Sequence, residues 1–281
     1  MQALADFFTS PLAFPFMVRG LVASALVGAL CAVMGTYVVL RGLAFFGDAL
    51  AHAILPGVAV GYLTTAGDRR SLFWWGLGTA ILVALGIGAV SKRGRLKEDT
   101  AIGVVFAGMF ALGIALISTV RGYAVELVHF LFGNVLGVST HDLVLIGAFG
   151  GAALLVVLLF YKEFLVISFD PDLAATLRLP TAFLRQLLLV LIAVTVVVSL
   201  KTVGVALMLA MLVTPAATAY LLVKRFSWMM AVGAGLGALS GVLGLYLSYW
   251  TGIASGAAIV LVATGLFLLV LLSRLPRGGG A

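Results

Sequence analysis

Apolar residues dominate this chain in long runs that short polar segments separate. The runs lie at residues 17–40, 43–65, 71–91, 99–120, 141–161, 184–201, 203–223, 228–250 and 254–273. Each is close to the ~20 apolar residues that a helix needs to cross a bilayer. The pattern therefore predicts an all-α integral membrane protein, a polytopic bundle of about nine transmembrane helices, or eight if one segment is re-entrant.

Composition supports a membrane location. Of the 281 residues, 63% are hydrophobic and only 10% are charged, and the mean hydropathy is +1.25. A soluble domain averages about 25% charged residues. This chain lacks the polar groups to cover its surface in water, so we expect residues 1–281 to form a single transmembrane domain.

Positive charges predict the orientation. The segment 91–97 contains four Lys and Arg residues and is expected on the cytoplasmic side of the membrane. Alternation then puts residues 162–183 and 224–225 on that side and, with nine spans, the N-terminus outside. The short basic segment 68–70 falls outside, against the rule. The net charge of +7 belongs to such loops and not to a basic face with interleaved aromatic residues, so no nucleic-acid partner is expected.

One carboxylate lies well inside an apolar run. Asp48 belongs to the run 43–65, and a carboxylate at mid-bilayer costs about 3 kcal/mol, so it is normally retained for a function. His52 follows four residues later, on the same helical face. A carboxylate oxygen and an imidazole nitrogen one turn apart can bind one divalent cation, and this pair of ligands suits zinc or manganese.

Two prolines predict interruptions in helical hydrogen bonding. Pro56 cannot donate to the carbonyl of His52, so that oxygen is either a further ligand or the mark of a kink. Pro215 likewise releases the carbonyl of Met211, as a gating hinge or as a packing feature.

The predicted metal site is incomplete. Two ligands do not fill a metal shell, so a second chain or other helices must supply the rest. The alternative interpretation is that Asp48 and His52 form a structural hydrogen-bonded pair. Glu126 and His129, three residues apart in a weakly apolar segment, are a candidate external entry point for metal, against an ordinary interfacial role.

Glycines recur at a spacing of four residues in two predicted helices, as Gly57 and Gly61 and as Gly233, Gly237 and Gly241. Small residues at this spacing let helix backbones approach closely in lipid. We expect tight packing there, within the bundle or at a dimer face.

Four segments carry strings of residues that occur together in one family. They are residues 39–58, with G-D-x-x-x-H at 47–52, then 98–106, 129–137 and 203–219, with T-P-A-A-T-A at 214–219. In this order they resemble the zinc/manganese permease family of bacterial ABC importers, over about residues 40 to 220.

This resemblance implies a homodimeric permease that two cytoplasmic ATPase subunits drive and an extracytoplasmic metal-binding protein supplies. In the family the aspartate and histidine of G-D-x-x-x-H are metal ligands in the translocation path, and here they are Asp48 and His52. The family fold is similar to that of the cobalamin and siderophore importers. Zn²⁺ or Mn²⁺ would be transported, ATP would bind the partner subunit, no cofactor would stay bound, and this chain would not be an enzyme.

The loop 162–183 is expected to be a cytoplasmic coupling loop, and part of it resembles the family's short helix that docks on the ATPase. Asp170 is a good N-cap, Pro171 a good first helical residue, and Asp172 is favourable to the helix dipole. The family often has glycine where this chain has Arg178. An ordinary helical loop is the alternative.

Other classes of function lack their motifs. The chain contains neither H-E-x-x-H nor G-x-x-x-x-G-K-[ST], so we expect neither a zinc protease nor a self-contained ATPase. A serine protease would need an activated serine beside a histidine, and only His52 lies deep enough. A stand-alone, ion-coupled metal transporter with Asp48 and His52 as a relay remains the alternative.

Overall fold

The computed structural model describes residues 9–65, 68–118 and 135–274. These residues are almost entirely helical and contain no strand. Among them are nine helices that are long and apolar enough to cross a membrane. Their ends differ from the predicted spans by a few residues; the sixth, for example, begins at Thr181 and not at 184. The predicted all-α polytopic fold with nine spans is confirmed.

The described helices belong to two compact units, each assembled from separate stretches of chain. Of the described residues, the first unit draws on 9–39, 135–144 and 206–274, and the second on 40–65, 68–118 and 145–205.

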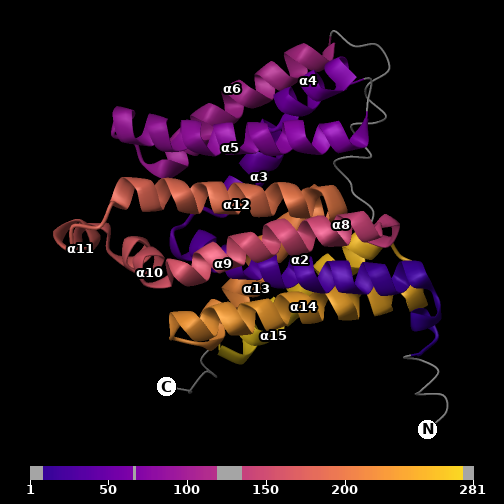
Figure 1. Ribbon diagram of the computed structural model, residues 1–281. Coiled ribbons are helices and arrows are strands. Elements are labelled where there is room, and N and C mark those ends of the chain that lie inside the picture. Colours follow the sequence, from indigo (N-terminus) through magenta and orange to yellow (C-terminus); the bar gives the residue numbers. More distant parts are fainter. Residues whose placement is uncertain (1–8, 66–67, 119–134, 275–281) are drawn as a thin grey trace, which may run out of the picture. The chain divides into compact units, whose positions relative to one another are not determined.

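The first unit is built on long helices. Its elements are η1 (Pro11–Ala13), α2 (Pro15–Leu40), η2 (Val135–Gly137), most of α8 (Thr140–Leu145), α13 (Val205–Leu222), α14 (Phe226–Thr251) and α15 (Ser255–Arg274). Helices α14 and α15 pack side by side (Figure 1). A Cβ atom on Gly28 of α2 or on Gly237 of α14 would collide with the carbonyl of the other glycine, and one on Gly241 with the backbone of Ser24. The expected tight packing therefore occurs here within the chain.

The second unit contains the predicted site. Its elements are α3 (Ala44–Ala53), α4 (Leu55–Thr65), α5 (Arg69–Gly94), α6 (Glu98–Ser118), η3 (Ile146–Gly150), which is a π-helical turn, α9 (Gly151–Leu159), α10 (Tyr161–Phe169), α11 (Pro171–Thr176) and α12 (Thr181–Val203). Helix α12 runs along α5 (Figure 1), and α3 packs on α6. Gly57 and Gly61 bring α4 against Thr79 and Trp75 of α5, where a side chain would collide.

The second span consists of two short helices. Helix α3 ends at Ala53, Ile54 forms a turn, and α4 begins at Leu55 with Pro56 in its first turn. Proline is well suited to a first turn, because its missing N–H would have no helical partner there. The amide of Ile54 bonds to the carbonyl of Leu50 at 3.2 Å and also reaches the carbonyl of His52.

Pro215 lies inside α13, and the helix continues through it. The side chain is buried, and the turn before it lies against α2, because a Cβ atom on Gly35 would collide with the carbonyl oxygen of Leu212. A packing role at Pro215 therefore has a visible basis, and a gating role stays a prediction.

Candidate functional site

Asp48 and His52 lie one turn apart on α3, and their contact is through the backbone. The Nδ1 atom of His52 lies 3.0 Å from the carbonyl oxygen of Asp48 and 3.6 Å from its Oδ1 atom. A carbonyl oxygen only accepts, so Nδ1 carries the hydrogen in this bond. The lone pair then lies on Nε2, the arrangement in which a second bond fixes the tautomer of a metal-binding histidine.

Both side chains of this pair lie on the partly open side of α3, whose first turn also exposes Ala44 and Phe45. The side chains of Asp48 and His52 are 34% and 30% exposed, whereas Phe46, Ala49 and Leu50 on the other faces are buried. A carboxylate and an imidazole on an open stripe remain accessible to a cation. The geometry therefore permits the ligand role that the sequence predicts.

Aromatic rings from α6 hold the imidazole. Phe106 and Phe110 meet the ring of His52 edge to face, with centroid distances of 6.4 and 5.7 Å, and Phe106 also contacts Phe45 of α3 at 5.6 Å. Such contacts restrict the orientation of the ring. No spacing in the sequence predicts these partners. Phe106 is the last residue of the string 98–106, which is one of the four segments that resemble the permease family. That resemblance assigns no role to Phe106.

One chain does not complete a metal shell within the part that the structure describes. No group of three or more His, Cys, Asp or Glu side chains able to hold a metal ion occurs among these residues. Glu126 and His129 lie outside the described residues. A metal site that includes Asp48 and His52 would therefore need further ligands beyond a cluster of the described residues of one chain.

The predicted N-cap is present at α11. The Oδ1 atom of Asp170 accepts hydrogen bonds from the amides of Asp172 and Leu173 at 3.0 and 2.9 Å, and Pro171 is the first helical residue. Asp172 lies in the first turn, where a negative charge is favourable to the dipole. This short helix is thus held by its own sequence.

The end of α11 explains why glycine suits the position of Arg178. Arg178 has φ = 56°, in the left-handed region, and the next amide, of Leu179, bonds back to the carbonyl of Ala174 at 3.1 Å. This is the Schellman arrangement, in which the left-handed residue is most often glycine. Arginine there retains the geometry at a local conformational cost.

An apolar stripe follows α11 outside the spans. Phe169, Leu173 and Leu177 are exposed and four residues apart, whereas Ala174 is buried. Leu173 and Leu177 share one face of α11, and Phe169 is the last residue of α10, just before the N-cap Asp170. The helix therefore presents large apolar side chains on a segment that lies outside the lipid-crossing helices.

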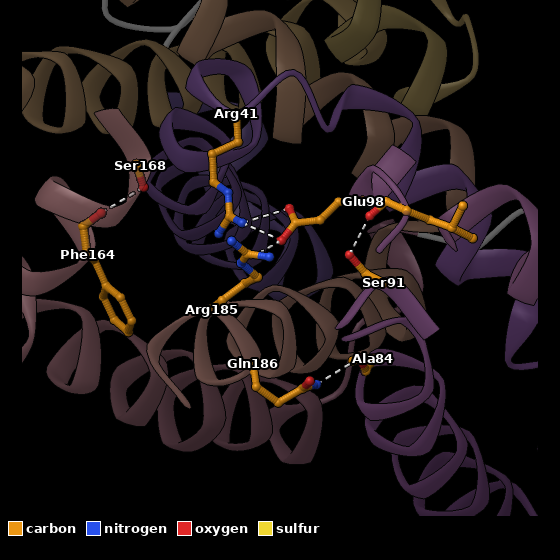
Figure 2. A network of polar contacts seen from close by, with 9 residues as sticks. Arg41, Ala84, Ser91, Glu98, Phe164, Ser168, Arg185 and Gln186 are labelled. Atoms are coloured by element: carbon orange, nitrogen blue, oxygen red, sulfur yellow. Dashed lines mark hydrogen bonds and ion pairs between the residues drawn. The ribbon is translucent and has the colours of Figure 1, made fainter. Parts of the chain in front are cut away.

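Three charged residues converge near these elements. The Nη2 atom of Arg41 lies 2.6 Å from both carboxylate oxygens of Glu98, and the Nε atom of Arg185 lies 3.2 Å from one of them (Figure 2). Arg41 lies between the first two spans. Burial lowers the pKa of Arg41, the carboxylate of Glu98 opposes this shift, and the charge of Arg185 adds to it. This cluster was not predicted, because each of the three residues by itself is an ordinary charge at the end of a span.

Comparison of the sequence with known proteins identifies the family of this chain. The ABC 3 transport family matches residues 13–274. The manganese transport system membrane protein MntC of Halalkalibacterium halodurans is 44% identical over 269 residues, which cover 96% of this chain and 91% of the relative. The chelated iron transport system membrane protein YfeD of Yersinia pestis is 37% identical over 279 residues, covering 97% and 90%.

Solved structures agree. A chain of PsaBC from Streptococcus pneumoniae, in complex with Fab, superposes with a TM-score of 0.80 at 36% identity and covers 95% of each chain. A chain described as a metal-chelate type ABC transporter in an inward-facing conformation gives a TM-score of 0.68 at 18% identity, covering 92% and 86%, a likeness of fold alone. A family match over nearly the whole chain and a close relative of similar length lead to one conclusion: this chain belongs to the ABC 3 transport family.

Proposed function

We propose that this chain is the permease subunit of an ATP-driven ABC importer that carries a divalent transition metal, with manganese as the first candidate cargo and zinc as the second. The coarser part follows from family membership: the chain is a multi-pass protein of the bacterial plasma membrane and a permease subunit of an ABC metal transporter. Manganese is favoured because several relatives, including ScaB of Streptococcus gordonii, are named for manganese import.

The observation that carries the proposal is the open pair of Asp48 and His52. One oxygen and one nitrogen ligand suit manganese, iron and zinc alike. Neither side chain is enclosed, and Nε2 of His52 is the ring nitrogen left for a metal. Two copies of the chain would supply four ligands, so the site is proposed to form between the subunits of a homodimer in the translocation path.

A second feature supports the ATP-driven mode. The apolar stripe of Phe169, Leu173 and Leu177 is exposed on a segment predicted to be cytoplasmic. Large apolar side chains in water favour a protein partner. We assign this partner as the ATPase subunit, one on each copy, with α11 and its N-cap Asp170 as the docking element. An extracytoplasmic binding protein would deliver the metal on the other side.

The transport cycle is alternating access. Metal enters from outside, Asp48 and His52 hold it transiently, and ATP hydrolysis on the partner opens the path inward. ATP chemistry belongs to that partner, since this sequence has no G-x-x-x-x-G-K-[ST] string. The rival is a stand-alone transporter in which the same two residues relay ions.

Reconstitution separates these two mechanisms. Proteoliposomes that contain the permease with its ATPase subunits should take up radioactive manganese only when ATP and the binding protein are supplied. Competition by zinc and iron(II) in the same assay ranks the cargo. Uptake by the purified permease alone would contradict the importer function.

Substitution tests the ligands. Asp48→Ala and His52→Ala should each reduce uptake to background while the ATPase subunits still copurify. His141→Ala is the matched control, because His141 is an exposed histidine at the start of α8 and should transport normally. Unchanged uptake in the two α3 variants would exclude the ligand role.

A further inference from the structure

The cluster of Arg41, Glu98 and Arg185, named here the charge cluster, joins three separate elements of the second unit. Arg41 lies in the three-residue link before α3, Glu98 is the first residue of α6, and Arg185 lies in the second turn of α12. Figure 2 shows both guanidinium groups directed at the single carboxylate. The side chains of Arg41 and Glu98 are 9% and 14% exposed, and that of Arg185 is 40% exposed.

The charges of this cluster do not balance. Arginine stays charged at physiological pH, so two positive groups share one negative group. The Nη1 atom of Arg41 is buried and has no hydrogen-bond partner within the described residues. Buried ion pairs of this kind contribute little net stability compared with apolar packing, and a switching or specifying role is one reason for keeping them.

A hydrogen bond beside the charge cluster attaches α12 to α5. The Nε2 atom of Gln186 donates to the carbonyl of Ala84 on α5 at 2.8 Å. Gly88 leaves the space for this amide, because a Cβ atom there would collide with Gln186. The attachment of α12 to α5 thus has a hydrogen bond of its own, whereas the contact of Arg185 with Glu98 joins α12 to the start of α6.

The two contacts of Glu98 differ in strength. Nη2 of Arg41 lies 2.6 Å from both oxygens, in a largely buried pair, whereas Arg185 makes one 3.2 Å contact and is much more open to water. Short contacts between buried charges are the stronger ones. A shift of α12 would therefore break the Arg185 contact first and leave a neutral Arg41–Glu98 pair.

The cluster lies between the two functional elements already described. Helix α11 leads through a four-residue link into α12, which carries Arg185. On the other side, Arg41 leads through Gly42 and Leu43 into α3, which carries the proposed metal ligands. The orientation predicted from the positive charges puts all three residues of the cluster at the cytoplasmic ends of their spans.

We propose that Glu98 is a positioning residue that links α12 to α3: movement of α11 and α12 on the ATPase breaks or restores the Arg185–Glu98 contact and thereby repositions α3 through Arg41. This inference rests on the proposed function. It assigns to Arg185 the switching contact and to Arg41 the permanent one. Loss of the switching contact should uncouple ATP hydrolysis from metal movement without preventing either assembly or ATP binding.

The test measures metal transported per ATP hydrolysed, in proteoliposomes with the complete complex. Arg185→Gln should assemble and hydrolyse ATP at a rate near that of the wild type, with at least about a fivefold lower ratio, as expected for an allosteric coupling of ordinary size. Arg185→Lys restores the charge and should recover part of the ratio. Arg274→Gln is the control, because the guanidinium of Arg274 bonds to the carbonyl of Leu222 at 3.0 Å, within the first unit; its ratio should not change.

A double-mutant cycle tests the link itself. If Arg185 acts through Glu98, the double variant Arg185→Gln, Glu98→Gln should transport as much metal per ATP as the more impaired of the two single variants. Additive losses of this ratio in the double variant would overturn the link. Thermal unfolding identifies variants that fail to fold. If Glu98→Gln does not fold, the ratio measured for Arg185→Gln still tests the proposal, because Arg185 is the most exposed residue of the charge cluster.

The two proposals fail differently. A normal ratio in Arg185→Gln, in a complex whose wild type transports metal with ATP, would overturn the role of the charge cluster and leave the importer function intact. Uptake by the wild-type permease without ATPase subunits would instead overturn the importer function.

Discussion

The Nδ1 atom of His52 is closer to the carbonyl oxygen of Asp48, at 3.0 Å, than to its carboxylate, at 3.6 Å. The second distance is beyond the range of a side-chain hydrogen bond. The carboxylate is therefore not closed onto the imidazole, as a purely structural pair would require. Both the Asp48 oxygens and the Nε2 atom of His52 stay available to a cation, which favours the ligand interpretation.

The first prediction concerns which nitrogen of His52 binds metal. Glutamine puts its terminal atoms near the position of Nε2, whereas asparagine reaches only the position of Nδ1. If Nε2 is the ligand, His52→Gln should retain a measurable part of manganese uptake and His52→Asn should match His52→Ala. Uptake by the reconstituted complex checks this, and greater activity in the asparagine variant would exclude Nε2.

The second prediction concerns the cap of α11. Asp170→Ala removes the acceptor for two amides and should destabilise this short helix by about 1 kcal/mol. If the helix must be formed to bind the ATPase subunit, affinity should fall about fivefold. Asp170→Asn keeps an acceptor and should bind normally. Titration of the purified ATPase subunit onto each permease measures both, and equal affinities for alanine and asparagine would rule out the cap as a determinant.

The third prediction concerns the left-handed residue that ends α11. Arg178→Gly should stabilise the end of the helix by about 1 kcal/mol, because glycine adopts positive φ without steric cost. Hydrogen exchange of the Leu179 amide, which bonds to Ala174, should slow accordingly. Arg178→Ala removes the charge but keeps the Cβ atom and should give no such gain. A similar slowing in both variants would attribute the effect to charge.

The fourth prediction uses two glycines of α14. A methyl group on Gly237 would collide with the carbonyl of Gly28, whereas one on Gly235 would meet nothing within 4 Å. Gly237→Ala should therefore destabilise the purified protein by about 1–3 kcal/mol, as overpacking does. Gly235→Ala should unfold at the wild-type temperature or slightly above it. Thermal unfolding in detergent compares them, and equal midpoints would show that α2 can move away without cost.

Sequence reasoning predicted the features that depend on neighbouring residues. The spans follow from runs of apolar residues, and the cap at Asp170 from a local pattern that the structure reproduces in two hydrogen bonds. The stripe of Asp48 and His52 follows from the four-residue period of a helix. The roles of these residues as ligands and docking elements stay predictions.

Features that depend on residues distant in sequence were not predictable in the same way. Phe110 meets His52 only because α6 packs on α3. Glu98 meets Arg41 and Arg185 only because three span ends come together. Nothing in the period or composition of one span specifies which neighbour it meets.

The break at Ile54 affects what a transport cycle costs. Pro56 has no amide hydrogen, so the backbone bond between α3 and α4 that it would make is missing in every conformation. Breaking such a bond in an apolar medium costs about 4–6 kcal/mol. The bond from Ile54 to Leu50 lies on the α3 side of the proline and can move with α3. When α3 tilts and carries Asp48 and His52 with it, side-chain packing resists the movement, but no hydrogen bond at Pro56 has to break. Each transport cycle therefore avoids the cost of breaking that bond.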